Sequence, residues 1–253
     1  MRKVLAMLAL ACALSASASA DALEIRPYAG YTTVNMGDAN ADMQNLKGGL
    51  QLFVIFASGT YQEYENRSLS DGVVLGADIS SDRILHSKSL KLAWRNEYLQ
   101  TNEATYRAHS VSLGTLDVDM TEQGTLSSSL LGLYWSPMQD ESSLKLSLGL
   151  FGGLGYGSFF RRIDFQNGGP YTSGLYSRLG FVGQFETKLD WQLSSHFSLG
   201  ASCGYRLAAL GQVFDGNGKS MQNSYGAALG GPSYAVGVDF SGYNATGALS
   251  FSF

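Results

Sequence analysis

Apolar and polar residues alternate along several long stretches of the chain. From Leu144 to Leu150 every second residue is leucine, and Lys145, Ser147 and Gly149 occupy the positions between them. A period of two places successive side chains on opposite faces of a β-strand. The same alternation recurs in three further stretches, which are 179–193, 197–207 and 243–253. Each stretch is therefore predicted to be a strand with one apolar face and one polar face.

Applied to the whole chain, this pattern predicts eight strands. Their expected positions are about 23–36, 71–80, 88–102, 124–136, 142–160, 179–193, 196–213 and 234–253. Strands of soluble proteins average about five or six residues, whereas tilted strands that cross a membrane need roughly nine to eleven. Short links such as 137–141 alternate with long polar ones such as 161–178, as turns and external loops do in membrane barrels. The predicted fold class is an all-β, closed antiparallel transmembrane β-barrel.

The first long connection, 37–70, can be interpreted in two ways. Its apolar residues lie at spacings of three and four, which favours a short helix at the outer rim: Met43, Leu46, Leu50 and Val54. The segment from Leu50 to Phe56 also alternates as a strand would, and 106–120 would then supply a further strand, giving ten. We expect the helix and eight strands.

The N-terminus has the pattern of a secretory signal peptide. Arg2 and Lys3 precede an apolar run over 4–14 that is too short to cross a bilayer as a helix, which needs roughly 20 residues. Small residues follow it, and Ala18 and Ala20 stand where a signal peptidase reads the chain before cutting ahead of Asp21. The sequence thus predicts a cleaved leader over 1–20, export through the periplasm, and a mature barrel domain over 21–253.

A lipoprotein signal is the alternative for this leader, because "LALAC" could direct acylation of Cys12. Ala9 stands three residues before Cys12, where lipoprotein signals usually carry Leu, and a better cleavage site lies downstream. These two observations favour the ordinary signal peptide.

Charge and cysteine content narrow the function classes. The formal net charge is −4, and losing Arg2 and Lys3 with the leader makes the mature chain more acidic, which argues against nucleic acid as a partner. Cys203 is the lone cysteine of the mature chain, so neither an intramolecular disulfide nor a cysteine-based zinc site can form. No cofactor and no metal are predicted.

The C-terminal stretch, "GYNATGALSFSF", carries the most specific motif. Alternate positions are aromatic or apolar up to the terminal residue: Tyr243, Leu249, Phe251 and Phe253. With the leader, this stretch resembles the small OmpA-type and OmpX-type outer-membrane barrels over residues 21–253. The resemblance implies a monomer in the cell outer membrane, among its lipid and lipopolysaccharide. It also implies that the barrel assembly machinery reads these four residues during biogenesis.

The polar faces of the predicted strands carry charges of both signs. The inward positions include Glu24, Arg26, Lys91, Arg95, Glu97, Glu186, Lys188, Asp190 and Arg206. An eight-stranded interior is just wide enough for such side chains to fill it. We therefore expect a plug of ion pairs in the lumen and no continuous open pore.

Two histidine patterns were considered as catalytic sites. His196 and Ser198 make an H-x-S spacing that resembles lipid A deacylase barrels, but both fall in the inward phase beside a periplasmic turn. His109 lies near Asp117 and Asp119 in an external hairpin, similar to the carboxylates and histidine of outer-membrane proteases. A solvated loop face, able to hold a divalent cation weakly, is the favoured interpretation of that D-x-D. Neither G-x-S-x-G nor H-E-x-x-H occurs, so no enzymatic activity is expected.

Two function classes remain, and a third is weaker. The favoured one is a non-enzymatic barrel whose loops serve envelope structure, adhesion or ligand contact. The expected surface loops are 37–70, 103–123, 161–178 and 214–233. The alternative is a narrow porin-like channel for small solutes, and the weaker third is a lipid-modifying enzyme or protease. The loop sequences identify no ligand.

Overall fold

The computed structural model describes residues 23–81, 89–111, 115–137, 143–166, 171–224 and 232–253. Eight strands form a closed antiparallel ring in the order β6-β4-β3-β1-β12-β9-β8-β7, and pairing of β6 with β7 completes it. The predicted leader, with Ala18, Ala20 and Asp21, lies outside the described residues. The ring confirms the predicted fold class and strand number.

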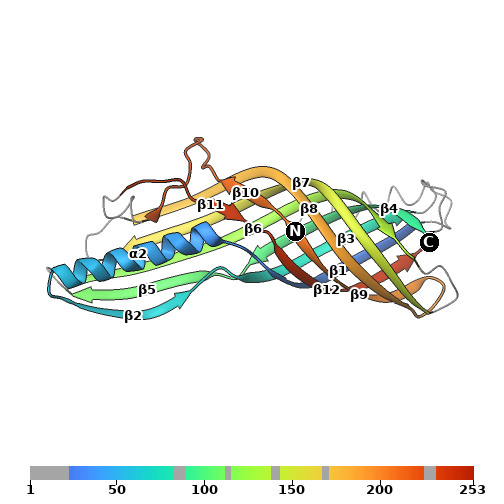
Figure 1. Cartoon of the computed structure of the whole chain (residues 1–253), viewed down its shortest axis with the longest axis horizontal. Helices are drawn as coiled ribbons and strands as arrows, with labels where there is room; N and C mark the ends of the chain where they lie inside the picture. The colour runs from blue at the N-terminus through green and yellow to red at the C-terminus, as the bar shows by residue number, and fades with distance from the viewer. Residues whose placement is uncertain (1–22, 82–88, 112–114, 138–142, 167–170, 225–231) are drawn as a thin grey trace.

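The ring strands are much longer on one side than on the other. Their bounds are β1 Leu23–Thr33, β3 Asp71–Ser81, β4 Leu90–Thr101, β6 Thr115–Trp135, β7 Leu144–Phe165, β8 Tyr171–Gln192, β9 Phe197–Leu207 and β12 Gly242–Ser252. At the end that holds the C-terminus, β8 and β9 are joined by a short turn (Figure 1). At the other end β6, β7 and β8 continue well beyond their neighbours, and we call this outer part the extension (Figure 1).

The outer face of the ring is apolar and its inner face is filled. On β7, Leu150, Leu154 and Tyr156 are exposed, whereas the alternating residues Ser147 and Phe151 are buried. The apolar face stops at Phe160, since the next outward residues on β7 are Arg162 and Asp164. A closed ring with an apolar outer band is the arrangement of a barrel that crosses a bilayer.

The predicted external loops 103–123 and 161–178 are wrong in large part. β6 begins at Thr115, β7 runs on to Phe165, and β8 already begins at Tyr171. In these segments the alternation is reversed, because the inward side chains, such as Met120, are apolar and the outward ones, such as Asp119, are polar. The strands therefore seemed to end where the membrane band ends. The strands continue because side chains from elements outside the ring pack on their inner face and form a second apolar core there.

Helix α2, Gly37–Phe56, supplies that cover (Figure 1). The predicted helix is confirmed, although it has 20 residues and is not short. Its buried residues include the four that the spacing identified: Met43, Leu46, Leu50 and Val54. The described residues of the stretch 106–120 nevertheless lie in strands, because β5, Ala104–Val111, pairs with the outer half of β6 and with β2, Thr60–Arg67. β2 and β5 belong to the same sheet but stand outside the ring.

Two predicted strands are broken. After β9 the chain leaves the ring at Ala208 and forms β10, Ala209–Gln212, which pairs with β11, Gly237–Asp239. At the break, the Ala208 amide donates to the Ser241 hydroxyl, and the Phe240 amide donates to the Ala208 carbonyl. Ala208, Leu210 and Phe240 are buried in a shared apolar cluster with Met36 before α2. The pair β10–β11 therefore folds inward over the mouth of the ring.

Among the described residues, no helix has the length and apolar character required to cross a membrane.

Candidate functional site

The interior consists of successive layers along the barrel axis, and the inward side chains of β6 lie in these layers one after another. Tyr134 lies among the ring charges, and Leu130 and Leu126 lie in the apolar cluster at the mouth. Glu122 comes next, in a second charged group, and Met120 lies in the apolar core beneath α2. Charged and apolar layers therefore alternate along the barrel axis.

The first charged layer is centred on Arg95 of β4, which is fully buried. Its guanidinium binds Asp78 through Nε and Nη2 at 2.7 and 2.8 Å, and Glu186 through Nη1 and Nη2 at 2.8 and 2.6 Å. The Tyr134 hydroxyl lies 2.6 Å from a carboxylate oxygen of each acid. The Arg95 guanidinium also stacks on the Phe151 ring, 4.1 Å from its centroid. Each of its three nitrogens is thus bonded to side chains of the barrel wall.

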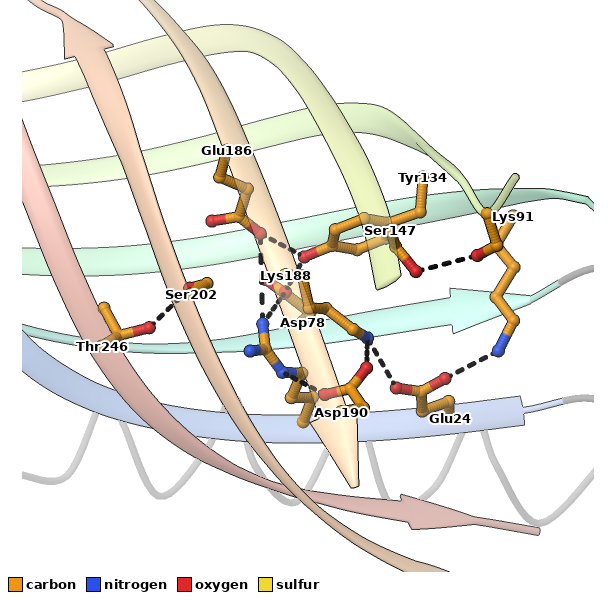
Figure 2. Close-up of polar contacts among 12 residues, drawn as sticks. Glu24, Asp78, Lys91, Tyr134, Ser147, Glu186, Lys188, Asp190, Ser202 and Thr246 are labelled. Atoms are coloured by element: carbon orange, nitrogen blue, oxygen red, sulfur yellow. Dashed lines mark hydrogen bonds and ion pairs between the residues drawn. The ribbon is translucent and has the colours of Figure 1, made fainter. Parts of the chain in front are cut away.

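Lysines extend this layer toward the short turns (Figure 2). The Lys188 Nζ reaches Glu24 at 3.0 Å and Asp190 at 2.9 Å, and the Lys91 Nζ reaches Glu24 at 2.8 Å. Arg26 is buried beside them, but its nearest carboxylate oxygen, on Asp78, lies 3.6 Å away and none of its nitrogens makes a hydrogen bond.

A third group closes the layer toward the mouth. Arg206 binds Glu97 at 2.8 Å, the Thr32 hydroxyl at 2.8 Å and the Phe240 carbonyl at 3.1 Å. The Tyr28 hydroxyl also donates to Glu97, at 3.1 Å. Arg206 thereby connects the ring wall to the chain that folds over the mouth.

All nine lumen residues predicted from sequence point into this layer. Asp78 was not among the predicted residues, and it brings the layer to five cations and five carboxylates. The alternation along β3 could have identified Asp78 as an inward residue. Val73 and Leu75 are exposed on one face of β3, whereas Val74 and Asp78 are buried on the other.

The second charged layer is smaller and joins α2 to the extension. Arg161 of β7 binds Asp42 of α2 at 2.9 Å and Glu122 of β6 at 2.5 Å, and all three are buried. Asp42 also accepts hydrogen bonds from the amide and hydroxyl of Ser224, at 2.8 and 2.6 Å. This group was not predicted from sequence, because Glu122 and Arg161 fall in segments that were expected to be loops.

The outer edge of the extension is held by α2 contacts with β2 and β5. The Lys47 Nζ lies 2.7 Å from Glu63, and this hydrogen bond lowers the pKa of Glu63 and raises that of Lys47. The Tyr61 and Tyr106 hydroxyls are 2.7 Å apart. Burial and this hydrogen bond raise the pKa of Tyr106 above its ordinary value.

The histidines considered for catalysis lie in ordinary surface settings. His109 contacts Asp117 across β5 and β6, on the outward face of the sheet, and Arg107 contacts Asp119 beside it at 3.2 Å. The His196 Nδ1 lies 3.0 Å from the Ser252 carbonyl at the short turn. Within the described ranges, no three His, Cys, Asp or Glu side chains gather as a metal site would require.

Three of the C-terminal motif residues lie on the outward face of β12, and Phe253 follows its last residue. Tyr243, Leu249, Phe251 and Phe253 are all exposed. Phe251 packs against Phe197 with ring centroids 5.6 Å apart, and Tyr243 packs against Tyr205 at 5.0 Å. The Phe253 amide bonds to the Leu23 carbonyl at 2.9 Å, which joins the two ends of the barrel.

No family model matches the chain, and no curated protein does. Solved structures similar to it include Neisserial surface protein A, at 11% identity and TM-score 0.39, covering 91% of this chain and 97% of that one. The outer membrane protein OprG from Pseudomonas aeruginosa is similar at 14% and 0.42, covering 93% and 98%. Ail, the attachment invasion locus protein of Yersinia pestis, is similar at 14% and 0.36, covering 90% and 98%.

Proposed function

We propose that the protein is a non-enzymatic outer-membrane barrel with a sealed lumen, and that its extension makes contact with molecules outside the cell. The observation that carries the proposal is the filling of the interior at successive levels. A paired charge layer and an apolar cluster occupy the ring, and a second charge group and a second core occupy the extension. The part left to interact with the surroundings is the outer surface of the extension.

Charge pairing in the lumen supports a structural role over a solute path. A conducting pore needs mobile water and charges that can exchange partners with an ion. Here Arg95 makes bidentate contacts with both of its carboxylates, and the apolar side chains of Leu126, Leu130 and Phe240 cover the layer. Moving an ion past them would require desolvation in a narrow interior.

Single-channel recording in planar bilayers tests the sealed lumen. The full-length protein should give no steady current, and insertion should be verified separately by heat-modifiable migration on a detergent gel. A steady, reproducible conductance would overturn the sealed barrel and favour the narrow solute channel.

Attachment assays test the role of the extension. Bacteria that express the protein should aggregate, or attach to cultured cells, more than matched bacteria that do not. Equal attachment of the two strains would contradict a contact function. His109 and Asp117 lie on the outward sheet face as a surface pair, so hydrolysis of lipids or peptides is not expected.

Biogenesis is expected to depend on the C-terminus. We propose that Phe253 and its outward neighbours are read by the barrel assembly machinery and that outer-membrane lipid and lipopolysaccharide surround the monomer. Deleting Phe253 should leave refolding from urea into detergent largely intact while lowering the amount assembled in cells. Assembly at the wild-type rate would contradict this role.

A further inference from the structure

Helix α2 ends in an exposed apolar tip at the outer extreme of the molecule (Figure 1). Four side chains of its last two turns project into solvent, with exposed fractions of 55% for Leu52, 46% for Phe53, 70% for Ile55 and 86% for Phe56. Buried Leu50 and Val54, on the opposite side of the helix, anchor it to the sheet. The C-terminal end of α2 therefore carries apolar side chains on all sides, but only the side with Leu50 and Val54 packs against the rest of the protein.

We propose that this tip, formed by Leu52, Phe53, Ile55 and Phe56, inserts into the lipid of a second membrane that faces the one holding the barrel. The inference rests on the proposed contact function and specifies its partner. Contiguous exposed apolar patches on proteins usually mark sites of interaction with proteins or membranes.

Backbone hydrogen bonds at the tip satisfy carbonyls of the last helical turn, which favours an apolar environment. The Ala57, Ser58 and Gly59 amides donate to the carbonyls of Phe53, Ile55 and Val54, at 3.1, 3.2 and 2.9 Å. This closure uses Ser58 in the left-handed region, with φ of 51°. Unpaired backbone groups are costly in hydrocarbon, so a helix end with its carbonyls bonded enters lipid more easily than an open one.

Charge and shape favour lipid over a protein partner. No charged residue occurs from Gly48 to Tyr61, and the nearest charges, Lys47 and Glu63, neutralise one another at 2.7 Å. A stable protein interface takes about 800 Å² and 20–30 residues from each side, far more than one helix end provides. Lipid can surround a projecting tip on every side and needs no complementary surface.

The membrane that holds the barrel is out of reach. A helix of 20 residues is about 30 Å long. It runs from the rim outward, so its last turn lies at the opposite end of the molecule from the C-terminus (Figure 1). The lipid that receives the tip must belong to another membrane.

Co-flotation of the full-length protein in nanodiscs with phosphatidylcholine liposomes tests the inference. Wild-type protein should float with the liposomes, and high salt should not release it because the tip is uncharged. Ile55→Ser and Phe56→Ser should each lower the apparent liposome affinity by about tenfold, since each removes one large apolar side chain from lipid.

Tyr64→Ser is the matched control, because Tyr64 of β2 is 62% exposed on the same extension but set back from the tip. It should float as the wild type does. Absence of flotation by wild type, equal loss in the control, or binding only to anionic liposomes would each overturn the inference. So would self-association of the wild type that the tip variants abolish without any lipid binding, because a second copy would then cover the tip.

A depth measurement separates insertion from surface contact. Ala57→Cys in a Cys203→Ser background gives a single labelling position at the tip, since Cys203 is the free cysteine of the described residues. Bimane at this position should be quenched by brominated acyl chains present only in the liposomes, and unquenched fluorescence in floated protein would overturn insertion. If the protein gives no channel current and supports attachment but does not bind liposomes, this inference alone is overturned. If the protein conducts, the proposed function is overturned.

Discussion

Arg95 in the ring and Arg161 in the extension are both buried arginines that bind two carboxylates, but their surroundings differ. Arg95 lies among five cations and five carboxylates on strands that the backbone already holds in a closed ring. Arg161 is the only cation that pairs with Asp42 and Glu122 in the described part of the chain, and it connects a helix to a sheet. The ring is closed by hydrogen bonds between strands, whereas α2 is held to the extension by side chains.

This difference indicates what each charged layer contributes. Removing a charge from the ring leaves the wall intact and leaves neighbours that can rearrange. Removing Arg161 leaves two buried carboxylates without a cation and loosens the contact that holds α2 in place. Breaking a buried ion pair typically costs about 3–5 kcal/mol.

The largest effect is expected for Arg161→Met. It should destabilise the docking of α2 by about 5 kcal/mol, at the upper end of that range, because no second cation can take over. Hydrogen exchange of the α2 amides, measured on the protein in nanodiscs, should lose its protection while ring amides keep theirs. Arg162→Met, on the outward face of the same strand, should change neither. If the two variants exchange alike, the pairing of Arg161 does not hold the helix.

Arg95→Met should cost less, about 3 kcal/mol, measured by urea unfolding in detergent. Arg26 lies 3.6 Å from Asp78 and can move toward the vacated position. The variant should also remain silent in planar bilayers, because the apolar cluster above the layer is unchanged. Lys91→Met, at the more accessible edge of the layer, serves as the control. A loss as large as that for Arg161→Met would mean that the two layers do not differ.

The apolar band distinguishes the two regions on their outer face. Leu150→Arg, midway between Leu144 and Tyr156 on β7, should destabilise the barrel by about 2 kcal/mol or more. Phe160→Arg, next to Arg162 at the end of the band, should cost about 0–1 kcal/mol. Both can be measured by folding into lipid vesicles. Equal costs at the two positions would mean that the band has been placed wrongly on β7.

The smallest effect concerns Glu63, which pairs with Lys47 at the exposed edge of α2. The lowered pKa of Glu63 means that its contribution is present above its ordinary value near 4.5 and is lost as pH falls through the folded value. Because both side chains are partly exposed, solvent screens the pair, and this contribution is about 0.5 kcal/mol or less. Exchange of the α2 amides should rise slightly at low pH in the wild type, and Glu63→Gln should remove that dependence. An unchanged pH profile in the variant would assign it to another group.

The ring and its charge layer were largely predictable from sequence. The period of two places Leu150 outward and Glu186 inward without any knowledge of neighbours, and the closed barrel follows from repeating it. Asp78 was within reach of the same reasoning, because its strand was predicted and only its phase was left unused. The apolar spacing of Met43, Leu46, Leu50 and Val54 likewise favoured the helix over a strand and identified the apolar residues that it buries.

The length of the strands in the extension could not be predicted from the same pattern, because the outer face of the extension does not contact lipid. Beyond the band the polarity of the two faces is reversed: charged Arg162 and Asp164 point outward, whereas apolar Ile163 is buried beneath α2. The rule that apolar side chains point outward, which holds in the band, therefore assigns these residues to the wrong face. Strand length there depends on a helix far away in sequence covering the inner face.

The sequence by itself determined a membrane barrel, its charged interior and one amphipathic helix. Only the tertiary structure decided that the helix docks on lengthened strands, that Asp42, Glu122 and Arg161 meet beneath it, and that Phe56 is left exposed. Those outcomes depend on which elements pack together, and local periodicity carries no information about that packing.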